Sequence, residues 1–186
     1  MSRYTLRRCT DADRKTLHDL RNETEAWLSA RGLEEQAGAH WSGRAHAAID
    51  RYLDDGRFVA LCVDGAPVVV GALSGPDLDF WTDDDDLGAA WYIARVMTAD
   101  HGNGYGALFL EMIAAAAAAN GRRALRLDCM RDNTRLHDYY RAQGFGLVRV
   151  VQRPWRKSGA LFERSLDRLM PAPWDRRAAP ADRDGQ

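Results

Sequence analysis

The sequence has few cysteines and no long hydrophobic run, and each absence excludes a class of protein. Three cysteines lie far apart, at positions 9, 62 and 129, without a C-x-x-C pair, so neither a disulfide framework nor a zinc site is expected. No stretch approaches the roughly 18 apolar residues of a membrane-spanning helix, and the N-terminal residues lack the apolar core of a signal peptide. The sequence therefore predicts a cytoplasmic protein without membrane partners.

Charge of either sign is also not in excess. The 186 residues carry 26 basic and 27 acidic side chains, a net charge of -1, which argues against nucleic acid as a partner. The five histidines are scattered, without an H-E-x-x-H motif or comparable spacing, so no metal site is predicted. Length and composition predict one domain over residues 1–170, and residues 171–186, rich in Pro, Asp and Arg, are expected to form a flexible tail.

The hydrophobic pattern changes several times between the period of a strand and that of a helix. A helix is expected to begin at Thr10 or Asp11 and to end at Gly32, and Gly121 and Gly144 are expected to end two later helices. Asp64 and Gly65 predict the turn of a hairpin. Expected strands cover residues 3–8, 58–63, 67–73, 89–98, 124–130, 145–151 and 161–166, and further helices cover residues 42–53, 105–120 and 133–143.

A cluster of glycines lies between an expected strand and an expected helix, in the sequence His101-Gly-Asn-Gly-Tyr-Gly. Glycine has no Cβ atom, so the backbone N–H groups of such a turn are open toward the start of the helix, where they lack intrahelical partners. The helix dipole favours an anion at that end. The cluster predicts a phosphate-binding turn, and the structural alternative is a tight connection between strand and helix.

The same glycines leave a second nucleotide-binding interpretation open. The spacing of Gly102, Gly104 and Ala107, with Asp128 ending the next strand, fits a variant of the dinucleotide-binding fingerprint and keeps an NAD(P)-dependent oxidoreductase as an alternative. Against it, residues 98–101 separate the strand from the first glycine, and too few residues follow Asp128 for a second mononucleotide-binding half. A Walker loop is excluded because no Gly-Lys-Ser or Gly-Lys-Thr follows.

The expected helix at residues 133–143 has Asn133, Leu136 and Tyr140 along one face, since their spacing is i, i+3 and i+7. An asparagine at a helix start is usually a cap, and a tyrosine on such a face usually packs in the core. Tyr139 points elsewhere on the helix and is expected to be a core residue.

Taken together, these two segments resemble the GNAT superfamily of acyl-CoA-dependent N-acetyltransferases. The family's Arg/Gln-x-x-Gly-x-Gly/Ala signature resembles residues 101–106, with His101 in place of Arg or Gln, and its Asn, Tyr and Gly-Phe signature resembles Asn133, Tyr140, Gly144 and Phe145. The resemblance implies an α+β fold of three layers, a GNAT-like acyl-CoA N-acyltransferase fold. Its single mixed, mainly antiparallel sheet would have about six or seven strands flanked by about four helices.

The resemblance also implies where acetyl-CoA binds as a co-substrate. The backbone N–H groups of one loop would hold the pyrophosphate, and the main chain at the end of the preceding strand, at Val96, Met97 and Thr98, would bind the pantetheine arm and the acyl group. Asn133 would contact the pantetheine arm, and Tyr140 would lie near the thioester sulfur. The loop consists of His101, Gly102, Asn103, Gly104, Tyr105, Gly106 and Ala107.

Direct attack of an amine on a thioester needs three groups. A backbone N–H, at Met97, would stabilise the oxyanion. Tyr140 would act as general acid, because a phenol with an ordinary pKa near ~10 stays protonated at neutral pH and can donate to the leaving thiolate. Asp128 is the candidate general base, and its alternative role is an ordinary strand-end or N-cap aspartate. Cys129 is not expected to be a nucleophile.

The sequence thus predicts an acetyl-CoA-dependent N-acetyltransferase acting on the primary amine of a small molecule. Acetylation of a protein N-terminus or lysine is an alternative, as is a non-catalytic acyl-CoA-binding domain, and a homodimer is possible. Residues 33–41 and 76–88 would shape the acceptor site.

The acidic residues 83–86 are expected to form a solvated loop or a helix start capped by Thr82, and attraction of a cationic amine is the functional alternative. Large aromatic side chains usually pack in the core, so core packing is expected for Trp27, Trp41, Trp81 and Trp91, and the lining of an acceptor pocket is the alternative.

Overall fold

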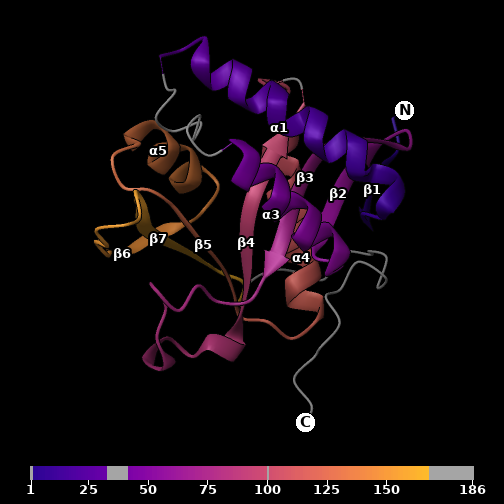
Figure 1. Cartoon of the computed structure of the whole chain (residues 1–186). Helices are drawn as coiled ribbons and strands as arrows, with labels where there is room; N and C mark the ends of the chain where they lie inside the picture. Colours follow the sequence, from indigo (N-terminus) through magenta and orange to yellow (C-terminus); the bar gives the residue numbers. More distant parts are fainter. Residues whose placement is uncertain (1, 33–41, 100, 168–186) are drawn as a thin grey trace. The chain divides into compact units, whose positions relative to one another are not determined.

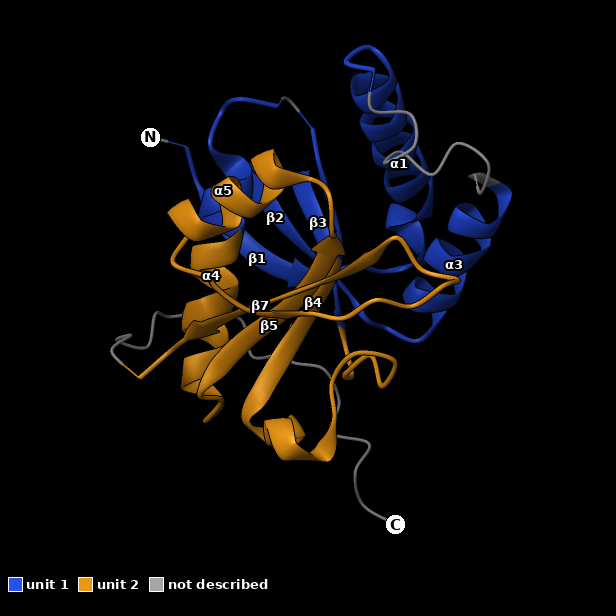
Figure 2. Cartoon of the chain, turned by 90° about the vertical axis from the view of Figure 1, so that its left-hand side faces the viewer, with its two compact units in different colours: residues 1–73, 95–109, 174–186 blue, residues 74–94, 110–173 orange. Residues whose placement is uncertain are grey.

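The computed structural model describes residues 2–32, 42–99 and 101–167 (Figure 1). They fall into two compact units (Figure 2). The first comprises the described residues up to Leu73 together with Arg95–Phe109, and the second comprises Ser74–Ala94 and the described residues from Leu110 onward. The expected tail at residues 171–186 and the expected acceptor loop at residues 33–41, with Trp41, lie outside the described residues.

Seven strands form one sheet in the order β1-β2-β3-β4-β5-β7-β6. The pair β4 and β5 is parallel, and the pairs β1–β2, β2–β3, β5–β7 and β6–β7 are antiparallel. The prediction of a mixed, mainly antiparallel sheet is therefore confirmed. The strands are β1 (Tyr4–Arg8), β2 (Phe58–Val63), β3 (Ala66–Ser74), β4 (Ala90–Thr98), β5 (Ala124–Met130), β6 (Gly146–Val150) and β7 (Ser158–Ser165).

The described part of the chain contains four α-helices: α1 (Arg14–Ser29), α3 (Ser42–Asp54), α4 (Tyr105–Ala119) and α5 (Thr134–Ala142). The strand β7 begins earlier than expected, at Ser158, because that residue pairs with Met130 of β5. The first helix also begins later than expected, after a 3-10 turn at Asp11–Asp13. Asp13 stabilises this turn by accepting the Thr10 N–H at 2.8 Å and by pairing with Arg7.

The first unit has a hydrophobic core between two helices and the sheet. Leu17 and Leu20 of α1 and Ile49 and Leu53 of α3 pack with Met97 and with apolar residues of β2 and β3. Figure 2 shows the two helices together beside strands β1–β3. On the other face of β3, an added Cβ at Gly71 would lie 2.8 Å from the ring of Phe109, so glycine lets the start of α4 pack closely.

Left-handed glycines end two helices of this fold, as the sequence predicts. At the end of α4, Gly121 has φ 74°, its N–H donates to the Ala118 carbonyl, and the Arg122 N–H donates to the Ala117 carbonyl. Gly144 ends α5 in the same way with φ 81°. Both ends are Schellman motifs, in which a residue without a Cβ atom adopts a conformation that side chains disfavour.

The acidic residues 83–86 form part of the structural framework of the second unit. Asp83–Asp85 is a 3-10 turn in which Asp85 accepts the Thr82 N–H, as the structural interpretation predicts. Arg149 of β6 donates to both carboxylate oxygens of Asp85, at 2.7 and 2.5 Å, and also to the Phe80 carbonyl. The pairing with Arg149 holds the pKa of the Asp85 carboxyl well below its usual range.

An Arg149→Gln variant is expected to be less stable at pH 7 by about 1 kcal/mol, a discounted value because the pair is partly solvated. Because the folded-state pKa of Asp85 is lowered, the ion pair stabilises the protein above the unfolded pKa near ~4 and is lost as the pH falls further. Urea unfolding at pH 7 and pH 3 measures this, and the difference from wild type should shrink at pH 3. An equal difference at both pH values would contradict it. Arg141→Gln, at the more exposed Asp138 pair, is the control.

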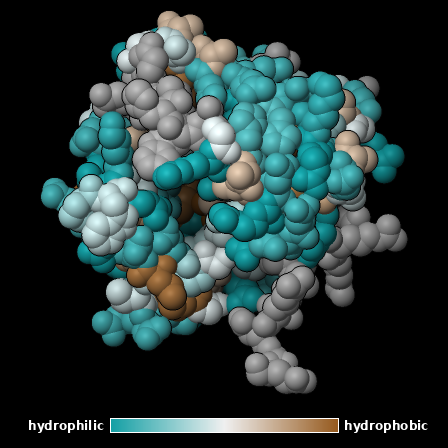
Figure 3. All heavy atoms as spheres, viewed as in Figure 1, coloured by the Kyte–Doolittle hydropathy of each residue, from teal (hydrophilic) through white to brown (hydrophobic). Residues whose placement is uncertain are grey.

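Figure 3 shows a face on which most side chains are hydrophilic and the apolar ones gather only in small groups. Within residues 2–32, 42–99 and 101–167, no helix is both long enough and apolar enough to span a membrane.

Candidate functional site

The predicted phosphate-binding loop has the expected backbone. Gly102 and Gly104 have φ values of 105° and 75°, and α4 begins at the next residue, Tyr105. Residues 101–104 are exposed, and an added Cβ at either glycine would meet no atom within 4 Å. The N–H groups of the first turn of α4 have no partners within the helix, because Leu108 donates the first intrahelical bond, to the Gly104 carbonyl. The loop is therefore an open cradle at the start of a helix, and its binding of a pyrophosphate stays a prediction.

His101, the first residue of the cradle, stacks on a side chain that the sequence did not connect with it. Its imidazole lies parallel to the Trp27 indole of α1, with 4.2 Å between ring centroids and 10° between planes. Arg31 packs over the same indole at 3.9 Å. Trp27 is thus partly exposed beside the cradle, not a core residue as expected, whereas Trp81 and Trp91 are buried.

The end of β4 places the predicted main-chain groups in an irregular strand. The parallel ladder with β5 covers Ala90–Tyr92, and further along β4 Arg95 has φ 54°, a conformation unlike that of a regular strand. Met97 turns its side chain into the core of the first unit, 3% exposed, and Val96 and Thr98 are partly buried. The role of the Met97 N–H in stabilising an oxyanion stays a prediction.

Tyr140 of α5 is held by aromatic packing. Its ring lies 5.7 Å from Phe145, 5.9 Å from Phe162 and 5.5 Å from Tyr139 between centroids. Its hydroxyl makes no hydrogen bond within the described part of the chain. Burial raises the pKa of the phenol, with smaller effects from the charges of Cys129, Tyr139 and Asp128. The phenol therefore stays protonated at neutral pH, as a general acid requires.

Two other residues of this helix test the structural alternatives. The Asn133 side chain caps α5, accepting the Leu136 N–H at 3.0 Å, so the capping interpretation is confirmed and its contact with pantetheine stays a prediction. The expectation that Tyr139 is a core residue is wrong, because 38% of it is exposed. The helical period placed Tyr139 on a different face from Tyr140, but that face is only partly covered.

Asp128 is an interior residue of β5 with a mostly buried side chain, 22% exposed. The Ser158 side chain is near enough to affect its carboxyl, and Arg156 Nη2 lies 4.0 Å from Oδ2. Burial raises the pKa of the carboxyl above its usual range, although Ser158 and Arg156 oppose the shift. This environment suits a general base, because a raised pKa makes a carboxylate a stronger base.

Cys129, next to Asp128 on β5, is 7% exposed. Burial raises the pKa of its thiol to about 12, so the thiol stays protonated and unreactive at neutral pH. This agrees with the expectation that it is not a nucleophile.

The predicted site residues thus fall into two groups, one in each compact unit. The cradle and the end of β4 belong to the first unit, and Asp128, Asn133 and Tyr140 belong to the second. Asp128 and Tyr140 are close enough that the carboxylate charge raises the pKa of the phenol. Ser158 and Arg156, which contact Asp128, were missed because no local spacing links them to β5.

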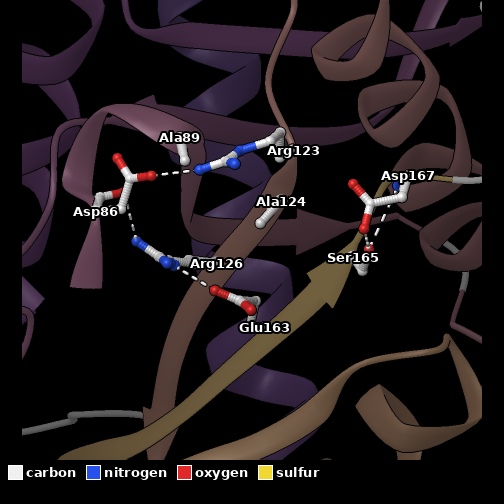
Figure 4. Close-up of a pocket in the computed structure, with 8 residues that line it drawn as sticks. All are labelled: Asp86, Ala89, Arg123, Ala124, Arg126, Glu163, Ser165 and Asp167. Carbon is white, nitrogen blue, oxygen red and sulfur yellow. Dashed lines mark hydrogen bonds and ion pairs between the residues drawn. The ribbon is translucent and has the colours of Figure 1, made fainter. Parts of the chain in front are cut away.

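The second unit also has a surface hollow at the starts of β4 and β5 (Figure 4). Its charged groups are paired with one another: Arg126 donates to Glu163 and to the Asp86 carbonyl, and Arg123 pairs with the Asp86 carboxylate. It contains none of the predicted site residues. Among the described residues, no group of three or more His, Cys, Asp or Glu is arranged to hold a metal. For the whole chain, the absence of a metal site stays a prediction.

Comparison with known proteins identifies the family. The model of the Acetyltransferase (GNAT) family matches residues 16–145, more than half of the chain. No curated protein sequence matches the chain.

Solved structures share the fold. A GNAT-family acetyltransferase from Listeria monocytogenes superposes with a TM-score of 0.67 at 21% identity, covering 87% of this chain and 94% of that one. YncA of Salmonella typhimurium, solved with acetyl-CoA, gives 0.56 at 15% identity, covering 91% and 98%. RimL, a ribosomal-protein alpha-N-acetyltransferase solved with coenzyme A, gives 0.63 at 15% identity, covering 88% and 94%. The sheet order and these superpositions contradict the doubly wound fold that an NAD(P)-dependent oxidoreductase would require.

Proposed function

Because the chain belongs to the GNAT acetyltransferase family, we propose that it transfers an acetyl group from acetyl-CoA to the primary amine of a small molecule by direct attack. The observation that carries the proposal is the cradle at residues 101–107. Its two left-handed glycines and the N–H groups at the start of α4, which lack partners within the helix, would form an exposed site for a pyrophosphate.

One group of this chain would act on each of the three reacting centres, which are the carbonyl oxygen, the acceptor amine and the leaving sulfur. Acetyl-CoA supplies an activated carbonyl and a sulfur leaving group. The Met97 N–H would donate to the carbonyl oxygen, where negative charge develops. Asp128, whose pKa is raised by burial, would take the proton of the acceptor ammonium, directly or through water. Tyr140 would hold the proton that the departing sulfur needs, an assignment that rests on the motif and on its raised pKa.

A small acceptor is our primary proposal, and a protein N-terminus or lysine is the alternative. The acceptor would enter as a cation, since primary amines are protonated at neutral pH. Assays with small primary amines in parallel with peptides that carry a free N-terminus or a lysine separate the two substrate classes, and transfer to peptides alone would favour the alternative.

A Gly104→Asp variant is expected to weaken acetyl-CoA binding by 100-fold or more, of the order of 3 kcal/mol. The added carboxylate would repel the pyrophosphate at its proposed position, and an added Cβ at Gly104 meets no protein atom within 4 Å. Isothermal titration with acetyl-CoA measures the change, with NADH and NADPH as controls.

Gly104→Asn is the matched control, because asparagine has nearly the same size and the same difficulty with φ 75° but no charge. It should bind more tightly than Gly104→Asp. Equal binding of acetyl-CoA by wild type and Gly104→Asp would contradict the cradle. Acetyl-CoA binding without transfer to any amine or peptide would instead favour the non-catalytic acyl-CoA-binding alternative.

A further inference from the structure

The proposed base has a positively charged neighbour that ought to neutralise it. Arg156 Nη2 lies 4.0 Å from Asp128 Oδ2, too far for a hydrogen bond, and 3.3 Å from the Ser158 hydroxyl. A guanidinium in direct contact would bind the carboxylate through two N–H groups and compete with any substrate cation. Another group must therefore hold the Arg156 guanidinium out of direct contact with the Asp128 carboxylate.

Asp77 makes the short contact with this guanidinium. Its Oδ2 accepts from Arg156 Nη2 at 2.8 Å, whereas Asp79 Oδ2 is 3.4 Å from Nη1. The guanidinium also lies over the Phe80 ring, 4.7 Å from its centroid. The Nη2 atom carries two N–H groups, and it donates to Asp77 at 2.8 Å and to the Ser158 hydroxyl at 3.3 Å. Asp128, at 4.0 Å, is left with the weaker contact.

The Asp77 carboxylate is itself fixed in position. Its other oxygen, Oδ1, accepts the Asp79 N–H at 3.1 Å, and its backbone carbonyl accepts the N–H groups of Phe80 and Trp81, both at 2.9 Å. Both carboxylate oxygens are therefore occupied, and the side chain forms an Asx turn with its own loop. Such a carboxylate is a rigid anchor for a long and flexible arginine.

We propose that Asp77 is a positioning residue for acetyl transfer, which holds the Arg156 guanidinium on itself and so leaves the Asp128 carboxylate free to take a proton from the acceptor ammonium. The proposal rests on the proposed role of Asp128 as base. The proton passes from the ammonium nitrogen to a carboxylate oxygen, and no other bond changes in this step. Asp77 acts only through Arg156 and its own charge.

The groups around Asp128 fix the direction of the effect. Asp77 raises the pKa of Asp128, and Arg156 and Ser158 lower it. The Cys129 thiol on the same strand and the Tyr140 phenol on α5 are also affected by the Asp128 charge, which raises the pKa of each. Removing the Asp77 charge thus lowers the pKa of Asp128 twice, by losing a like charge and by releasing Arg156 toward it.

The test is a carbon-13 NMR titration of the Asp128 carboxyl in the protein without substrate. Asp77→Asn should lower the pKa of Asp128 by about one unit or more, the effect of an opposite charge in contact. The double variant Asp77→Asn with Arg156→Gln should return it to the wild-type value or above, because the released cation is gone. Asp84→Asn removes the same charge from an exposed position and should leave it unchanged.

Activity gives the second readout. In Asp77→Asn, the acid limb of kcat/KM should move to lower pH and kcat should fall several-fold, and the double variant should recover both. Asp77→Glu, which keeps the carboxylate, should stay near wild type. An unshifted Asp128 in Asp77→Asn, or an equal shift in the double variant, would overturn the proposal. If Asp128→Asn keeps full activity, the proposed base is wrong and the proposal fails with it, whereas Asp128→Asn inactivity with an inert Asp77→Asn defeats the positioning role alone.

Discussion

Replacement of Tyr140 by phenylalanine is expected to lower kcat by about 100-fold or more, the usual contribution of a general acid. The change removes one oxygen and leaves a ring that packs against Tyr139, Phe145 and Phe162. Because no hydrogen bond to that oxygen is present within the described residues, stability should change little. Release of the coenzyme A thiol with the best amine of the panel measures the rate, and titration with acetyl-CoA should give a nearly unchanged Kd.

Tyr139→Phe provides a matched control on the same helix. It removes the same oxygen from the neighbouring residue, which is 38% exposed and has no proposed role. Its kcat should lie within about twofold of wild type, as for a surface substitution. A Tyr140→Phe enzyme as fast as Tyr139→Phe would show that another group, or water, protonates the sulfur.

A Gly159→Ala variant is expected to lose about 3 kcal/mol or more of unfolding free energy, since both a strained backbone and overpacking contribute. Gly159 has φ 127°, and an added Cβ would lie 2.1 Å from the Val151 carbonyl oxygen and 3.3 Å from the Phe80 ring. The Val151 N–H donates to the Gly159 carbonyl at 2.8 Å, so the two segments cannot separate without losing that bond. Urea unfolding measures the loss.

Two control glycines separate the causes. Gly88→Ala adds a methyl group at a position with open space and an ordinary φ, and should be close to neutral. Gly121→Ala adds it at φ 74° with open space, and should cost about 1 kcal/mol through the backbone alone. If Gly159→Ala is no less stable than Gly121→Ala, the close approach of Val151 is not a real constraint.

The features that the sequence predicted correctly are those encoded by neighbouring residues. Gly121 and Gly144 end helices because glycine alone adopts the left-handed conformation without cost, and the Asp64-Gly65 turn has both residues at positive φ. The two signatures predicted the family because each lies on one strand-to-helix or helix-to-strand connection. Such signals need no knowledge of the tertiary structure.

The features that the sequence could not predict join distant segments. The contact of Asp128 with Ser158 depends on the register of β5 with β7, and the pairing of Asp77 with Arg156 joins two loops. A one-residue change of register would have placed different side chains together, and no local pattern specifies the register. Tyr139 was assigned wrongly for a related reason: the helical period gives the direction of a side chain, not what covers it.

The end of α5 changes how the second signature should be interpreted. Gly144 closes the helix in a left-handed conformation, and the Phe145 N–H donates to the carbonyl of Tyr140 at 3.0 Å. The Gly-Phe pair therefore ends the helix through its backbone, and in the proposed mechanism only the tyrosine of this signature carries a reacting group. If the proposed mechanism holds, a relative that kept Gly-Phe and lost the tyrosine would retain this helix end without the general acid. In genome searches, Gly-Phe would then mark the architecture alone, and the phenol would mark the proposed chemistry.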